Sequence, residues 1–354
     1  MIDVSKMVPP GAKKANPYVT EDDSFGKAKT TTEGVKTNGV EKKTPYVSEE
    51  KGFTPREPSR GKPKSTTYTQ QAAVRCATRS LPEHDSDSPL IIIIDGDVLA
   101  YEACRGEWQR IVIRLKQAFG KDAYKKALME HTLTEELITR CWATFEAKLL
   151  EIQERFFNAP YVMAMKDGIN FRDDVYIDYK AYRKTKGVPN RIVPFMRDMA
   201  VEAGYSIPAD YREADDYVRT WATEAVAFGK VPIVASVDKD LKCIPGKHYN
   251  LQKQTLEDVA EIDAKKLYYS QLLSGDQTDG IPGLPGIGPV KGYEAIEFCV
   301  TEEDFQEAVV GTYLDIHGDD WAEYLLSNGK LIHIMADLND YFTLKDWPVA
   351  QELR

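Results

Sequence analysis

The chain has 354 residues, a formal net charge of −10 and five cysteines. Its length allows one large domain or two smaller ones. No stretch approaches the ~18 consecutive apolar residues of a membrane helix, and the N-terminus lacks the apolar run of a secretory signal. The cysteines are scattered without a Cys-x-x-Cys pair, which favours free thiols and argues against a disulfide framework or a zinc site. We therefore expect a cytoplasmic protein without a membrane partner.

Residues 1–89 differ in composition from the rest of the chain. They hold 9 of the 19 prolines but one isoleucine and one leucine, Ile2 and Leu81. So few aliphatic side chains cannot bury enough apolar surface to offset the entropy lost on ordering. The sequence predicts a disordered N-terminal extension, followed by a folded part with 31 basic and 44 acidic residues.

One short peptide is repeated within this extension. NPYVTEDDSF (16–25) recurs as TPYVSEEKGF (44–53), and each copy offers an aromatic residue, a Ser or Thr and an acidic run. Two interpretations stand side by side: chance similarity within a biased segment, and a duplicated peptide that docks a partner protein.

From residue 90 onward, strand and helix patterns alternate. Apolar runs typical of buried strands cover 90–95, 161–165 and 231–237. Helical spacing fills most of the ~60 residues between the first two runs. Another helix is predicted from EADD (213–216) to about Phe228, before Gly229. This alternation predicts an α/β fold, a mostly parallel sheet with helices on both faces. Beyond about residue 263 we expect helices, interrupted by a glycine-proline cluster.

Acidic residues gather where these elements begin or end. The clusters are Asp95 with Asp97, Asp167, Glu213 with Asp215 and Asp216, Asp238 with Asp240, and Asp276 with Asp279. Taken singly, each cluster has a structural explanation, either as favourable charge at a helix start or as a turn. Together they are expected to converge, because ligands of open α/β sheets bind at the carboxyl ends of the strands.

Such a cluster indicates a metal site. Carboxylates held close together repel one another, and sites made of oxygen ligands favour Mg²⁺ or Mn²⁺. Two such ions about 4 Å apart can stabilise both the attacking and the leaving oxygen of a phosphodiester displacement.

Two further segments suggest that the substrate is a nucleic acid. Residues 179–197 contain six Lys or Arg, no acid and several aromatic residues, which suits a phosphate backbone and unpaired bases. A solvated basic loop is the alternative. DGIPGLPGIGPVKG (279–292) has five glycines and three prolines before a predicted helix. Pro289 fits the first helical position, and the bare backbone at Gly286 and Gly288 allows a phosphate to approach.

In order and spacing, these motifs resemble the flap endonuclease and 5′-3′ exonuclease family. The resemblance covers about 90–345 and rests on IIDG, KDG followed by FR and YKAYR, EADD, the Asp-x-Asp after a buried strand, GDQTDGIPG and GIGPVKG. It implies a PIN-like nuclease core, a helical arch at about 168–200 and a C-terminal helix-three-turn-helix subdomain. The ending LNDYFTLKDW and the long helical segment after the first motif look most like podovirus-type phage exonucleases.

The resemblance also implies roles for individual residues. Two Mg²⁺ or Mn²⁺ ions would be held by Asp95, Asp167, Glu213, Asp215, Asp216, Asp238, Asp240, Asp276 and Asp279. The catalytic residues would be Lys180, Arg183 and Asp215. DNA would be bound by Tyr179, Lys184, Lys186, Arg191, Gly286, Gly288 and Lys291, with a K⁺ ion at the helix-three-turn-helix. Many relatives have Asn or Ser at the position of Asp97, so we expect this residue behind the metal ligands.

The implied function is a metal-dependent 5′-3′ exonuclease, with flap endonuclease and RNase H-type activity, in phage replication, primer removal or recombination. Its substrates would be DNA with a 5′ end, flap or gap and RNA–DNA hybrids, and its location the host cytoplasm. The expected domains are the extension at 1–89, the core at 90–262 and the C-terminal subdomain at 263–354. The resemblance does not extend to the repeated peptides; in the docking interpretation they would bind a replication or recombination protein.

Three alternative functions compete with this one. A haloacid-dehalogenase-type phosphatase would use Asp95 as nucleophile, but it leaves EADD, the basic stretch and GIPGLPGIG without roles. A PIN-like ribonuclease shares the acidic core and lacks the helix-three-turn-helix. A DNA-binding module with a decayed site is disfavoured because every acidic position is filled.

Overall fold

The computed structural model describes residues 88–168, 170–181 and 188–353. Residues 1–87, with both copies of the repeated peptide, lie outside this part of the chain, and so do Arg183, Lys184 and Lys186. In the described ranges, no helix is both long and apolar enough to cross a membrane. The expected disorder of the extension and the expected domain boundaries stay predictions.

A six-stranded sheet forms the centre of the fold, in the order β3-β2-β1-β4-β5-β6. Its strands are β1 (Leu90–Asp95), β2 (Tyr161–Lys166), β3 (Ile207–Ala209), β4 (Val231–Ser236), β5 (Gly246–Asn250) and β6 (Thr255–Val259). The first five strands pair in parallel, and β6 pairs antiparallel to β5. The mostly parallel α/β sheet is confirmed. The sequence does not predict β3, β5 or β6, because β3 has three residues and β6 buries none.

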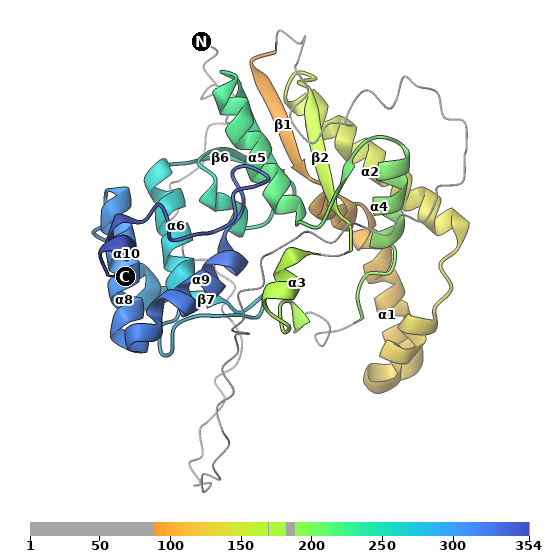
Figure 1. Cartoon of the computed structure of the whole chain (residues 1–354). Coiled ribbons are helices and arrows are strands. Elements are labelled where there is room, and N and C mark those ends of the chain that lie inside the picture. Colours follow the sequence, from red (N-terminus) through yellow and green to blue (C-terminus); the bar gives the residue numbers. More distant parts are fainter. Residues whose placement is uncertain (1–87, 169, 182–187, 354) are drawn as a thin grey trace, which may run out of the picture. The chain divides into compact units, whose positions relative to one another are not determined.

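Helices cover the sheet and build the C-terminal part (Figure 1). They are α1 (Gly96–Glu130), α2 (Glu135–Arg155), α3 (Phe171–Val175), α4 (Val193–Glu202), α5 (Ala214–Ala227), α6 (Glu261–Ser274), α7 (Pro289–Glu294), α8 (Glu302–His317), α9 (Trp321–Ile332) and α10 (Pro348–Glu352). Short 3-10 turns lie at Asp240–Cys243 and Gly318–Asp320. As predicted, α5 follows Glu213 and ends before Gly229, which has a left-handed φ of 71°.

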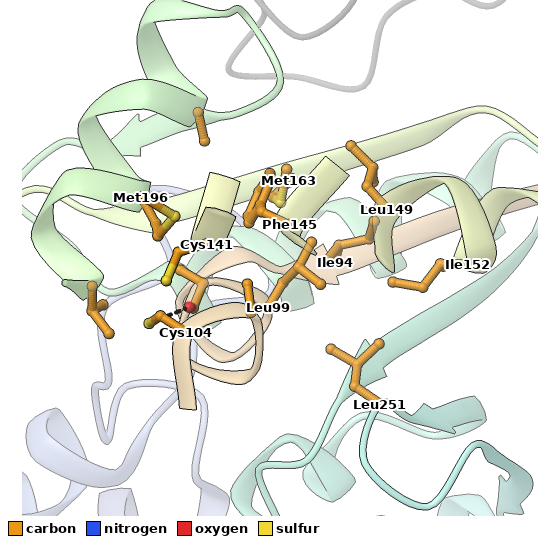
Figure 2. Packing of buried hydrophobic residues seen from close by; sticks show 14 of the residues in the cluster. Ile94, Leu99, Cys104, Cys141, Phe145, Leu149, Ile152, Met163, Met196 and Leu251 are labelled. Atoms are coloured by element: carbon orange, nitrogen blue, oxygen red, sulfur yellow. Dashed lines mark hydrogen bonds between the residues drawn. The ribbon is translucent and has the colours of Figure 1, made fainter. Parts of the chain in front are cut away.

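The central strand β1 is buried on both faces, between β2 and β4. Ile92 and Ile94 belong to a core shared with α1, α2 and α4, and Figure 2 shows this core from close by. Ile91 and Ile93 face the other way, into a second core with α5. A run of four isoleucines is therefore what this strand requires, because helices cover both faces of the sheet.

The junction between β1 and α1 packs tightly against β2. A Cβ at Gly96 would lie 2.6 Å from the carbonyl oxygen of Ala164 and 2.6 Å from Met165 Cγ, so no larger residue fits. Asp95 caps α1, because its Oδ1 accepts a hydrogen bond from the backbone N–H of Val98 at 3.2 Å. The IIIIDGD sequence thus turns a buried strand into a helix and leaves a carboxylate at the edge of the sheet.

The C-terminal part is mainly helical, as expected, and has its own core. Tyr269, Phe305 and Trp321 are buried in it. The glycine-proline cluster adds a short antiparallel ladder of β7 (Gly275–Asp276) and β8 (Ile281–Pro282), which the sequence pattern does not reveal. The backbones approach closely there, since a Cβ on Gly275 would lie 2.4 Å from the Gly283 nitrogen.

Candidate functional site

A cleft of about 890 Å³ opens where the parallel strands end. The end of β1, the start of α5, the loop after β4 and the β7–β8 loop border it. Seven of the predicted ligands line this cleft: Asp95, Glu213, Asp215, Asp238, Asp240, Asp276 and Asp279. They come together because parallel strands place their carboxyl ends at one edge of the sheet.

Asp95 is the most deeply buried carboxylate of the β1 end, with 3% of its surface exposed. Ser236, the last residue of β4, donates a hydrogen bond to Asp95 Oδ2 at 2.8 Å. Burial, followed by the charges of Asp97 and Asp238, raises the pKa of Asp95 to about 7, although the Ser236 hydrogen bond lowers it. Ionising Asp95 is therefore unfavourable unless a cation lies nearby.

Asp215 lies half-buried in the first turn of α5. Burial, followed by the charges of Asp95, Asp238 and Glu213, raises its pKa well above the usual range. Within the described ranges, no donor forms a hydrogen bond with its carboxylate. Three carboxylates from β1, α5 and the loop after β4 thus repel one another across the cleft.

Glu213, in contrast, is well partnered. Its Oε1 accepts hydrogen bonds from Lys180 Nζ at 2.5 Å and Asn170 Nδ2 at 2.9 Å, and its Oε2 accepts one from the Tyr179 hydroxyl at 3.1 Å. Burial by itself would raise the pKa of Glu213, but Lys180 and then Arg172 outweigh it, and the pKa falls to about 2. Glu213 is therefore ionised at neutral pH.

Lys180 joins two parts of the cleft. Its Nζ also lies 3.3 Å from Asp279 Oδ2, and its backbone N–H donates to the Asp279 carbonyl at 2.7 Å. The residue has a left-handed backbone with φ 54°, which is uncommon outside glycine. Burial lowers the pKa of its ammonium group, but the charges of Glu213 and Asp279 raise it more, so Lys180 stays protonated.

Asp238, Asp240 and Asp276 form a second acidic group. Burial, followed by the charges of Asp238 and Asp276, raises the pKa of Asp240 to about 7. Burial of Asp276 acts in the same direction, but Lys239, 3.9 Å away, contributes to lowering its pKa below the usual value. Gln271 of α6 donates to Asp240 Oδ1 at 2.6 Å, which links this group to the C-terminal helices.

The donor set of the cleft fits hard divalent cations. All seven acids offer carboxylate oxygens, and the described lining contains neither Cys nor His. As the side chains stand, no three His, Cys, Asp or Glu of the described residues are arranged as a ready set of ligands for one ion. A cation would relieve the repulsion that raises the pKa of Asp95 and Asp215.

Asp216, also expected to be a ligand, does not line the cleft. Asp216 is fully buried beneath the cleft, where Arg172 of α3 donates two hydrogen bonds of 2.8 Å to its two oxygens. The backbone N–H groups of Glu213 and Met335 also donate to it, at 3.1 Å each. These partners occupy the carboxylate and hold α3, α5 and the C-terminal segment together. The FR motif marks Arg172 in the sequence, but the sequence pattern does not show which carboxylate it pairs with.

Asp167 and Asp97 differ in their relation to the acidic group. Asp167 is exposed after β2 and does not line the cleft. Burial, followed by the charges of Asp210 and Asp198, raises its pKa, so its acidic neighbours belong to another group. Asp167 as a ligand stays a prediction. Asp97 lines the cleft and forms an ion pair of 2.6 Å with Arg197 of α4. Its place behind the ligands stays a prediction.

Comparison with known proteins shows which proteins this chain is similar to. No family model matches the chain. The exodeoxyribonuclease of enterobacteria phage T3 is 26% identical over 211 residues, which are 57% of this chain and 65% of the phage protein. The flap endonuclease Xni of Shewanella piezotolerans is 30% identical over 158 residues, 40% of this chain and 61% of that enzyme. The resemblance to the flap endonuclease and 5′-3′ exonuclease family is confirmed.

The matched part is less than two thirds of each of these two relatives. Among solved structures, the bacteriophage T5 flap endonuclease is similar with a TM-score of 0.49 at 14% identity, covering 69% of this chain and 88% of that chain.

Two residues expected to bind DNA have protein partners in this structure. Tyr179 is 5% exposed and donates its hydroxyl to Glu213. Arg191 donates to the backbone carbonyls of Leu128 and His131, at 3.2 and 2.7 Å, and so fixes the end of α1. Their contacts with DNA stay predictions.

Two glycines of the segment expected to form the family's helix-three-turn-helix differ in backbone conformation. Gly286 has a left-handed φ of 79°, whereas Gly288 is extended with φ −94° and could be another residue. A Cβ at either glycine would meet no atom within 4 Å, so the backbone there is open. Lys291 is exposed on the short helix α7 that follows. Their contacts with DNA, and the K⁺ ion, stay predictions.

Proposed function

We propose that the chain is a divalent-metal-dependent nuclease that hydrolyses phosphodiester bonds of DNA from a 5′ end. The observation that carries this proposal is the convergence of Asp95, Asp215 and Asp238 in one cleft. A polyanion cannot enter a wall of carboxylates unless cations neutralise it. The relation to exonucleases and flap endonucleases supports DNA as the polyanion.

The residues that would hold the cations belong to two groups. Asp95, Glu213 and Asp215 form the first, while Asp238, Asp240, Asp276 and Asp279 form the second, with Asp215 at their border. When bound, Mg²⁺ or Mn²⁺ supplies positive charge for the phosphate oxygens and a water molecule of lowered pKa.

The chain's own side chains orient this site. Ser236 fixes Asp95, while Asn170 and Tyr179 fix Glu213. Lys180 brings a protonated ammonium group into the acidic wall, where a phosphate of the substrate would meet it. Such a preorganised charge favours the state in which negative charge develops on the phosphate.

Basic side chains also line the cleft. They are Arg105, Lys166 and Arg197, from α1, the end of β2 and α4. Arg105 pairs with Glu102 at 3.5 Å and Arg197 with Asp97 at 2.6 Å. These cations suit the phosphate backbone of a DNA strand that passes over the acids. Duplexes with a 5′ end, flaps, gaps and RNA–DNA hybrids are the substrates to compare, with roles in replication, primer removal or recombination.

The test is digestion of 5′-labelled and 3′-labelled duplex, flap and hybrid substrates with and without Mg²⁺. We expect Mg²⁺-dependent release of mononucleotides or short oligonucleotides from 5′ ends, and no cutting in EDTA. Asp215→Asn should abolish cutting, by roughly a thousandfold or more, and leave DNA binding intact. Asp319→Asn, at an exposed acid outside the cleft, is the matched control and should behave like the unmodified chain. Undiminished cutting by Asp215→Asn would overturn the proposal.

A further inference from the structure

The second half of α1 is basic, although the folded part of the chain is acidic. Residues 110–130 hold six basic and two acidic residues, whereas the chain from residue 90 onward holds 31 basic and 44 acidic ones. We call 110–130 the α1 arm. In Figure 1, α1 leaves the carboxyl end of β1 and runs away from the sheet, so the arm extends beyond the sheet.

The cations of this arm are available to a partner. Five of them are exposed: Arg114, Lys116, Lys121, Lys125 and Lys126. Among the described residues, no carboxylate lies within ion-pair distance of any of these five. By contrast, the sixth cation, Arg110 at the start of the arm, pairs with Glu107 at 2.8 Å, and on α2 Arg140 pairs with Glu136 at 2.6 Å. An acidic protein that leaves five neighbouring cations unpaired presents a surface for an anionic partner.

The arm is held in place by packing. Gly120, with φ 75° and ψ 179°, bends α1, and beyond the bend Tyr124 returns so that Lys116 Nζ lies 4.9 Å from its ring centre. Leu115 and Leu128 are buried in the core shared with α2. Arg191, of the basic stretch 179–197, donates to the carbonyls of Leu128 in the arm and of His131 just after it, which joins the two segments.

The arm is also continuous with the cleft. Tyr101 and Arg105, on the first turns of α1, line the cleft. Lys116 follows Arg105 by three helical turns and lies on nearly the same side of the helix, about 16 Å further along. That distance corresponds to roughly five phosphates of one DNA strand. A strand leaving the cleft along α1 would therefore reach the unpaired cations.

We propose that the α1 arm binds the phosphate backbone of DNA that extends from the cleft, which rests on the proposed function. The arm would recognise backbone charge and no base sequence, because its contacts are lysine and arginine side chains without a groove-reading element. It would lengthen the footprint on the substrate without touching the acids.

The test compares Lys121→Gln/Lys125→Gln with Lys330→Gln/Lys345→Gln, which removes two exposed cations elsewhere. Binding is measured in EDTA against salt concentration, on a duplex of about eight base pairs and on one about twenty longer. For the unmodified chain and the control, the longer duplex should bind more tightly and with a steeper salt dependence. In the arm variant, the slope for the longer duplex should fall by up to about 1.8.

Equal slopes for the arm variant and the control would overturn the role of the arm. The proposed function fails separately, if the unmodified chain does not cut either duplex with Mg²⁺. The same salt titration on substrates with a single-stranded and with a duplex extension shows which form of DNA contacts the arm.

Discussion

Ser236 Oγ donates a 2.8 Å hydrogen bond to Asp95 Oδ2, which joins the carboxyl ends of β4 and β1. The same hydroxyl accepts a hydrogen bond from the backbone N–H of Asp238 at 3.0 Å. One small side chain therefore positions a buried carboxylate and the start of the loop that carries the second acidic group. Residues behind the ligands of a metal site commonly orient them and tune their affinity.

Ser236→Ala should raise the Mg²⁺ concentration that the site requires. Without its partner, Asp95 ionises less readily, so the Mg²⁺ concentration for half-maximal DNA cutting should rise roughly tenfold or more. Ser206→Ala is the control, because the buried Ser206 hydroxyl has no hydrogen-bond partner in the described ranges. An unchanged Mg²⁺ requirement would mean that the hydrogen bond has no part in positioning Asp95.

Stability of the metal-free protein should fall as the pH rises. The pKa of Asp95 is raised from 3.8 to about 7 in the folded state. Its contribution to the free energy of unfolding is therefore complete below about pH 4 and is lost as the pH rises to about 7. Asp240 acts in the same direction, whereas Glu213, with a pKa of about 2, contributes only below this window. We expect the melting temperature in EDTA to drop by several degrees from pH 5 to pH 8.

Two comparisons check the origin of that pH effect. Asp95→Asn should flatten the profile, since the amide does not titrate. Mg²⁺ at pH 8 should restore the melting temperature of the unmodified chain, because the cation binds the ionised folded state. A profile that is the same for both proteins would place the effect elsewhere.

Lys180→Met should slow cutting more than it weakens binding. We expect kcat to fall by roughly a hundredfold, because a preorganised charge beside the phosphate is lost, with little change in DNA affinity. Lys239→Met is the matched control, since Lys239 also approaches two acids but its side chain is 69% exposed. A loss confined to affinity would make Lys180 a backbone contact.

Breaking the Arg172–Asp216 pair should destabilise the fold strongly. Arg172→Met leaves Asp216 buried without its partner, which costs about 3–5 kcal/mol in unfolding free energy. Replacing both residues by apolar ones should recover much of this loss. Lys265→Met, which breaks two partly exposed ion pairs, with Glu261 and Glu302, should cost about 1 kcal/mol or less. Chemical denaturation measures all three, and equal losses for Arg172→Met and Lys265→Met would contradict the assignment.

Gly286→Val should weaken duplex binding while Gly288→Ala does not. Gly286 needs its left-handed backbone, and a side chain there costs about 1–2 kcal/mol of strain, more for a branched one. Gly288 is extended and has room for a Cβ. Duplex affinity, measured for folded variants, should fall severalfold for Gly286→Val alone. An equal affinity for both would reduce the segment to a structural turn.

The amino-acid sequence by itself determined the position and burial of β1, the start of α5 and the convergence of acids at one edge of the sheet. These follow from local rules, because a run of four isoleucines fits a strand covered on both faces and parallel strands end at the same edge. The tertiary structure alone decided which of two adjacent acids faces the cleft. Asp215 and Asp216 are neighbours in one helical turn, yet Asp215 faces the cleft and Asp216 faces Arg172. Arg172 is fixed in turn by the carbonyls of Leu331 and His333. Those carbonyls lie more than 150 residues further along the chain, and periodicity carries no information about contacts at that distance.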